Sequence, residues 1–293
     1  MERDYQNQQW VVRPLSGGYA ALESVSAEGQ CVTLRDGVPA SPDAPTNVTF
    51  AARLAGMARL LKSAGVNGVV LNDVNACGVN VNLLKREVLE NVGRNVGPVL
   101  EKFGITPFFS ACFAAPTLLD NVTADPLSAS TQAWWAAKVD QIYEFLPGFG
   151  GLLVKADSEG NVGPMTYNRT EADGANLLAA PLAPRGGVMI WRAFVYANAD
   201  FGHEELVKQS YDTFVPLDGD FAENVVLQIK NGPMDFQIRE PAHPLFGVLN
   251  RTNVMLEVQA VWLAASSLSL FFLPECSPLS RRPRSTRASR STR

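Results

Sequence analysis

Polar side chains follow several apolar runs of this sequence, and their types could perform acid–base chemistry on an acidic ligand. One run ends in Lys155, Asp157 and Glu159, and another carries Arg192 directly after a tryptophan. Two further runs end in a similar set: Lys230, Asn231 and Asp235, and Asn72, Asp73 and Asn75. Two carboxyl groups on opposite sides of a glycosidic bond can protonate the leaving oxygen and activate water. Lysine and arginine can neutralise a substrate carboxylate.

These charges have a second interpretation, because strand-end charges also form structural ion pairs around the mouth of a barrel. The spacing of the residues does not choose between a binding site and such ion pairs. It also does not identify a sugar.

The polar residues belong to a repeating pattern of strands and helices. Continuous apolar runs, typical of buried parallel strands, lie within residues 65–76, 104–116, 148–160, 186–196, 223–236 and 253–260. Helical periodicity is predicted between them, in residues 50–65, 83–100, 134–146, 171–180 and 203–214. Gly93 and Gly97 are weak points in the second helical stretch. Alternating strands and helices predict a parallel sheet.

The expected fold class is α/β, as an incomplete (β/α)₈ TIM barrel with six to seven recognisable strands; a doubly wound sheet is the alternative. No glycine-rich phosphate-binding motif follows any of the runs, which disfavours a nucleotide-binding protein. The carboxyl ends of the strands form the catalytic face of such a barrel. The polar residues above are therefore expected to meet on that face.

Several long strings resemble the α-glucuronidases of glycoside hydrolase family 67. They include GVNGVVLNDVNA, GGLLVKADSEGNVGPMTYNRTEADGANLLA, WRAFVY, QIKNGPMDFQ and TNVMLEVQ, and the resemblance covers about residues 46–260. It implies a (β/α)₈ barrel that removes (4-O-methyl-)glucuronic acid side groups from xylo-oligosaccharides with inversion. It implies neither a cofactor nor a metal ion.

The resemblance also implies the roles of individual residues. Glu159 matches the general acid of the family, and Asp235 matches an aspartate on the base side. Lys155, Arg192 and Lys230 match the residues that hold the uronate carboxylate. Asn72 and Asn75, at the end of the first run, are further candidate substrate-binding residues. An inverting enzyme needs its acid and base about 6.5–9.5 Å apart to admit a water molecule.

The sequence departs from the family pattern at both ends. A second base-side glutamate is expected shortly after the LEVQ string, but counting places Leu263 there. We expect a divergent segment at residues 1–45, a partial catalytic domain at 46–260 and an aberrant tail at 261–293 that resembles a frame change or an unspliced segment. Residues 19–35 are a candidate substitute strand. The alternatives to an active enzyme are a non-catalytic uronate-binding remnant and an inactive fragment.

Charge and composition limit the partners. Of the net charge of −4, residues 1–275 carry −10 and the arginine-rich residues 276–293 carry +6. An acidic body argues against nucleic acid as the main partner, although a basic tail could bind an anion. The apolar run at 261–273 is shorter than the roughly 20 residues of a membrane span, and the polar first ten residues lack a signal core. Family members are secreted or cytoplasmic, and the oligomeric state is unknown.

The cysteines and histidines predict no metal centre. Four cysteines are scattered and only two histidines occur, so neither zinc-finger spacing nor a disulfide framework is expected. Cys77 and Cys112 follow predicted strands, where buried thiols are the ordinary expectation.

Overall fold

The structure is a computed structural model. It describes residues 9–15, 19–25, 31–32, 50–72, 77, 81–158, 160–194, 206–231 and 241–258. Of the first three ranges only the backbone is described. Among all these residues, no helix has the length and apolar character needed to cross a membrane.

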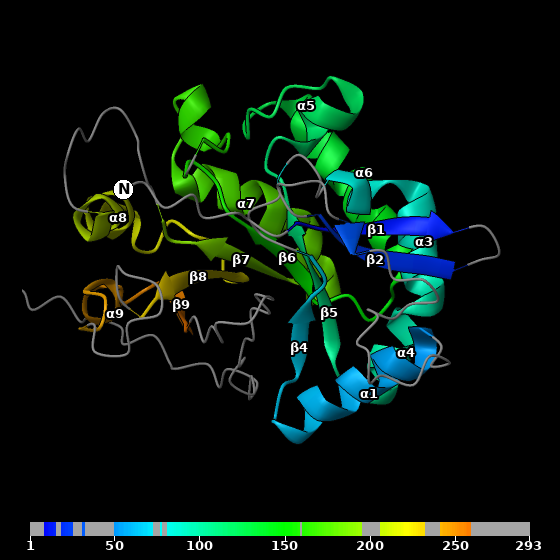
Figure 1. The fold of residues 1–293 in the computed structure, drawn as a ribbon. Helices are drawn as coiled ribbons and strands as arrows, with labels where there is room; N and C mark the ends of the chain where they lie inside the picture. Colours follow the sequence, from blue (N-terminus) through cyan, green and yellow to red (C-terminus); the bar gives the residue numbers. More distant parts are fainter. Residues whose placement is uncertain are drawn as a thin grey trace, which may run out of the picture.

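A parallel sheet of six strands forms the body of the molecule. Its strands pair in the order in which they occur in the chain: β4 (Gly68–Val70), β5 (Thr106–Ala111), β6 (Gly151–Val154), β7 (Val188–Arg192), β8 (Val225–Lys230) and β9 (Asn253–Glu257). Each strand falls within one of the six predicted runs. A doubly wound sheet would reverse its strand order at a switch point, and this sheet has no reversal. It curls instead into a half barrel with helices around it (Figure 1).

Helices connect consecutive strands and cover the outer face of the sheet (Figure 1). They are α1 (Phe50–Ser63), α3 (Arg86–Asn95), α4 (Gly97–Lys102), α5 (Ala115–Asp120), α6 (Ala129–Phe145), α7 (Glu171–Leu182), α8 (Leu206–Phe214) and α9 (Leu245–Val248). Short 3₁₀ helices add η1 (Val81–Leu84), η2 (Pro164–Tyr167), η3 (Ala183–Arg185) and η5 (Val215–Leu217). Four of the predicted helical stretches are confirmed, and the fifth is confirmed from residue 206 on, since residues 203–205 lie outside the described ranges. The second stretch breaks at Val96, directly before Gly97, into α3 and α4.

Side chains alternate between the two faces of the sheet because the side-chain period of a strand is two. Phe108, Leu153, Ile190 and Met255 form a cluster made of strand residues alone. Their neighbours in sequence pack on the opposite face against the helices, as Phe109 and Leu152 do. The strand-only cluster therefore marks the concave, inner face of the half barrel.

The segment before α1 forms a separate sheet. β1 (Gln9–Leu15), β2 (Tyr19–Val25) and β3 (Cys31–Val32) pair antiparallel with one another, and none of them pairs with the parallel sheet. The prediction of a substitute barrel strand at residues 19–35 is therefore wrong for the described part of that range. The hydrogen bonds of β2 are formed with β1 and β3 instead of with β4.

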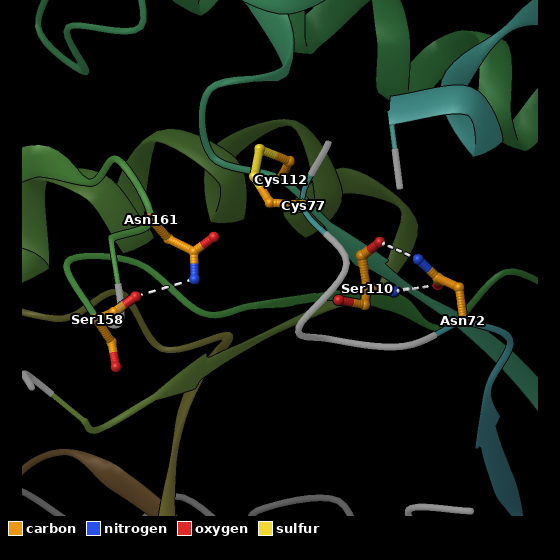
Figure 2. Close-up of a disulfide and its surroundings, with 6 residues drawn as sticks. All are labelled: Asn72, Cys77, Ser110, Cys112, Ser158 and Asn161. Atoms are coloured by element: carbon orange, nitrogen blue, oxygen red, sulfur yellow. Dashed lines mark hydrogen bonds between the residues drawn. A yellow bond between two sulfur atoms is a disulfide. The ribbon is translucent and has the colours of Figure 1, made fainter. Parts of the chain in front are cut away.

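A disulfide joins the segment after β4 to the end of β5. Cys77 and Cys112 are 35 residues apart in sequence, and their Cα atoms lie 4.7 Å apart (Figure 2). The prediction of two buried thiols is wrong, because the parallel pairing of β4 with β5 brings the ends of both strands to the same edge. The bond fixes Cys77 next to the carboxyl end of β5.

The disulfide yields a stability prediction. Closing a loop of this length stabilises a fold by about 3–4 kcal/mol in the chain-entropy treatment. A reducing agent should lower the urea midpoint of the oxidised protein, as followed by circular dichroism. The double variant C77S/C112S should show the lower midpoint both with and without the reducing agent. Equal midpoints with and without reductant in the unsubstituted protein would contradict a stabilising disulfide.

A second stability prediction concerns Gly151, the first residue of β6. Its φ is 142°, and a Cβ atom there would collide with the backbone carbonyl of Val188 on β7. Gly151→Ala should therefore destabilise the fold by about 2–4 kcal/mol, through strain and overpacking together. Gly148→Ala is the matched control, because a Cβ at Gly148 meets no atom within 4 Å. Urea unfolding of both variants checks this; equal small losses would contradict it.

Candidate active site

Three cations lie at the carboxyl ends of three consecutive strands, on the inner face. Arg192 lies two positions beyond Ile190 on β7, Lys230 ends β8, and Lys155 follows β6 two positions beyond Leu153. Since residues two apart share a face, all three point to the same side as the inner cluster. Each is buried, with 6–7% of its surface exposed. Burying charged side chains is costly unless they are paired, so this rim is a specialised environment.

Arg192 is held by a residue that the sequence interpretation did not select. Glu257, the last residue of β9, accepts hydrogen bonds from Nε and Nη2 of Arg192 at 3.1 and 2.7 Å. Both side chains are buried, with relative exposures of 6% and 7%. The pair bridges β7 and β9 over the intervening strand β8. It uses two of the five N–H donors of the guanidinium group.

An aromatic ring brings two of the cations together. The ring centroid of Phe194 lies 4.4 Å from Cζ of Arg192 and 4.7 Å from Nζ of Lys230. Cation–π attraction and burial of the ring favour this arrangement. Lys230 is also directly opposite Glu257 in the register of β8 and β9. Arg192, Lys230, Glu257 and Phe194 therefore form one connected cluster, here called the rim cluster.

The two predicted catalytic carboxylates, Glu159 and Asp235, lie outside the described residues, as does Asn75. The residues flanking position 159 are described. The carbonyl oxygen of Ser158 accepts hydrogen bonds from the backbone N and the Nδ2 of Asn161 at 3.0 and 2.9 Å (Figure 2). Ser158 and Asn161, on either side of position 159 in the sequence, are thus joined by two hydrogen bonds after β6. The acid–base separation stays a prediction.

Asn72 has a structural contact at the end of β4. Its Nδ2 donates to the carbonyl oxygen of Ser110, and its Oδ1 accepts from the Ser110 N–H, both at 2.7 Å (Figure 2). The side-chain amide thus pairs with the backbone of β5 as an added strand residue would. Its proposed contact with substrate has to coexist with this pairing.

Behind the rim lies an acidic pair, the buried Glu171 and the partly buried Asp157. Glu171 begins α7 and is 1% exposed, and its Oε2 accepts a 2.7 Å hydrogen bond from Nε1 of Trp191. Burial raises the pKa of Asp157 to about 6. Burial and the negative charge of Asp157 raise the pKa of Glu171 well above its usual range. Both carboxyls therefore resist ionisation at the same time.

The sequence signals for Glu257 and Glu171 were weak. Glu257 lies two positions after Met255 and therefore on the same face of β9. Only the register of β7, β8 and β9 shows that it meets Arg192. Glu171 lies in the first turn of a helix, where acidic residues are common because they complement the helix dipole. Nothing local indicates that it is buried. Within the described ranges, no three histidine, cysteine, aspartate or glutamate side chains are grouped to hold a metal ion.

The buried pair of Arg192 and Glu257 yields a prediction. Glu257→Ala leaves a buried guanidinium without this partner, and breaking such a pair costs about 3–5 kcal/mol. Glu144→Ala is the matched control, because Glu144 also forms a two-point contact with an arginine, Arg86, but both side chains are more than half exposed. It should cost about 1 kcal/mol or less. Urea denaturation measures both; similar losses would contradict the structural role of Glu257.

Comparisons with known proteins agree with the family resemblance. The model of the glycosyl hydrolase family 67 middle domain matches residues 40–264. A probable alpha-glucuronidase A of Neosartorya fischeri is 47% identical over 211 residues, which are 71% of this chain and 25% of that protein. An alpha-glucuronidase of Hypocrea jecorina is 45% identical over 204 residues, 69% of this chain and 24% of that protein.

A third relative extends the match along the chain. A probable alpha-glucuronidase A of Aspergillus terreus is 42% identical over 246 residues, 83% of this chain and 27% of that protein. This chain thus spans about a quarter of the length of these relatives. Because the family model covers most of the sequence and the strands it spans form the half barrel described above, the chain belongs to glycosyl hydrolase family 67 and carries its middle domain.

Proposed function

We propose that this chain acts in the removal of (4-O-methyl-)glucuronic acid side groups from xylo-oligosaccharides, as an α-glucuronidase. The observation that carries the proposal is the convergence of Lys155, Arg192 and Lys230 on the inner rim of a family 67 half barrel. Buried cations on the catalytic face of a barrel suit a ligand that bears a carboxylate. The names of the curated relatives agree with this chemistry.

In the proposed complex, Arg192, Lys155 and Lys230 hold the uronate carboxylate. Glu257 fixes the plane of the Arg192 guanidinium through two hydrogen bonds, so that the remaining N–H donors keep one direction. Phe194 holds the Arg192 and Lys230 side chains on one ring. Ordering these long side chains in advance reduces the entropy lost on binding.

The proposed reaction is a single displacement with inversion. Glu159 donates a proton to the leaving oxygen of the xylose unit, while Asp235 removes a proton from a water molecule that attacks the anomeric carbon from the opposite face. The sugar leaves as glucuronic acid, and the oligosaccharide gains a hydroxyl group. Asn72 and Asn75 are proposed to contact the substrate from the end of β4.

A second candidate is a uronate-binding protein without catalysis. The observation that favours it is Leu263 at the position expected for the second base-side glutamate, which lies outside the described residues. Asp235 would then be the sole family-matched carboxylate on the base side. Binding of the uronate would survive, because the rim cluster does not include that position.

The function is tested with the full chain and three ligands: glucuronic acid, glucose and a glucuronic-acid-substituted xylotriose. Calorimetry should show binding of glucuronic acid and little binding of glucose, because only the former has a carboxylate. Lys230→Ala should weaken glucuronic acid binding about 10- to 100-fold, the effect of losing a charged hydrogen bond. Lys102→Ala, an exposed lysine on α4, is the matched control and should bind normally.

Turnover separates the two candidates. Release of glucuronic acid from the substituted xylotriose that falls at least 100-fold in Glu159→Gln, with binding retained, supports the glycosidase and its general acid. Binding without any release supports the uronate-binding protein. Absence of glucuronic acid binding, or full activity of Glu159→Gln, would contradict the proposed site.

A further inference from the structure

The loop after β6 is anchored by Asp157 in an unusual backbone conformation. Asp157 has φ = 43°, in the left-handed region that non-glycine residues rarely adopt. Its Oδ2 accepts a 2.9 Å hydrogen bond from the Met165 backbone N–H, at the start of η2. A Cβ at position 163 would collide with the same carboxyl group, so Gly163 lets the chain pass directly against it. One side chain thus joins both ends of the loop that contains residue 159.

The second member of the acidic pair comes from a different element. Thr170 and Asp173 form a capping box at the start of α7, which fixes the position of Glu171. Glu171 Oε2 is held by Trp191 on β7, the residue before Arg192. Its other oxygen, Oε1, is buried and has no hydrogen-bond partner within 3.5 Å among the described residues. The negative charge of Asp157 is the charge that raises the pKa of the Glu171 carboxyl.

The surroundings of the pair favour one proton on two carboxyls. The groups that contact it from η2 and β7 are neutral donors, the Met165 N–H and the Trp191 indole. No other charged group in the described ranges shifts the pKa of either carboxyl. Two negative charges in this desolvated position without a cation repel strongly, whereas one proton between the groups removes this repulsion.

We propose that the partly buried Asp157 and the buried Glu171 share one proton as a carboxyl–carboxylate pair that positions Ser158 and Asn161 against α7 and β7. The pair is a positioning device, since neither group is placed at the reacting atoms. Its consequence for Glu159 rests on the proposed function, because that residue lies between Ser158 and Asn161 in the sequence.

Backbone amide hydrogen exchange of residues 157–167 tests the positioning role in the full chain. Glu171→Ala should speed the exchange of the Asn161 and Met165 amides at least 10-fold, whereas Glu171→Gln should stay within about threefold. Glutamine can still accept from Trp191 and donate to Asp157. Glu101→Ala, an exposed glutamate on α4, is the matched control and should show no change. Unchanged exchange in Glu171→Ala, or equal effects of alanine and glutamine, would overturn the proposal.

The pH dependence provides a test that does not need the alanine variant to fold. A carboxyl with a raised pKa in the folded state contributes stability below its unfolded pKa and loses it as the pH rises through the folded value. The unsubstituted protein should therefore lose stability relative to Glu171→Gln as the pH rises from 4.5, the ordinary pKa of a glutamate, through the raised folded pKa of Glu171. The indole N–H signal of Trp191, assigned with Trp191→Phe, should shift with pH in the former and stay constant in the latter. Identical pH profiles would overturn the shared proton.

Kinetics then connect the pair to catalysis. On the substituted xylotriose, Glu171→Ala should lower kcat at least 10-fold while KM changes less than threefold, because Arg192 and Lys230 are held by Glu257 and Phe194 and not by Glu171. Glu171→Gln should restore kcat. Equal losses in kcat and KM would overturn a role specific to the acid turn. If the unsubstituted chain shows no turnover, the proposed function fails, and the exchange and pH results still decide whether the pair positions the turn.

Discussion

The strict side-chain period of two in parallel strands that pair in chain order is the constraint on which this site depends. It places Lys155, Arg192, Lys230 and Glu257 on the concave face, each at or just beyond a strand end. A shift of one residue in any strand would move its charged side chain to the outer face, among the helices. Apolar residues two positions earlier on the same face, such as Ile190 and Met255, hold each strand in this register.

Within that frame, the pair of Arg192 and Glu257 has two consequences. It compensates the buried guanidinium, which would otherwise be costly to remove from water. It also gives the guanidinium a fixed direction, because two parallel hydrogen bonds define its plane. The two interpretations of strand-end charge, structural ion pair and ligand site, are thus compatible here. A structural carboxylate from β9 prepares the arginine that is proposed to bind the substrate carboxylate.

The turn after β6 is supported from behind in a comparable way. Polar groups on the inner side of the rim are proposed to meet the substrate, while Asp157, Glu171 and Trp191 form a second layer toward α7. The fully buried Trp191 lies next to Arg192 in the same strand, and alternation therefore points the two side chains to opposite faces. One strand, β7, thus contributes a side chain to each layer.

The sequence by itself determined the six strands, the five helical stretches and the family, because continuous apolar runs and helical periodicity are local properties and the family strings are long. It also selected Lys155, Arg192 and Lys230 as cations at strand ends. It did not reveal Glu257, the burial of Glu171 or the Cys77–Cys112 disulfide. Each of these depends on which distant residues meet: Glu257 on the register of β7, β8 and β9, Glu171 on the packing of α7 against Trp191, and the disulfide on the pairing of β4 with β5. Pairing and packing between distant segments are decided only when the strands and helices come together in three dimensions, and the tertiary structure therefore completes the site.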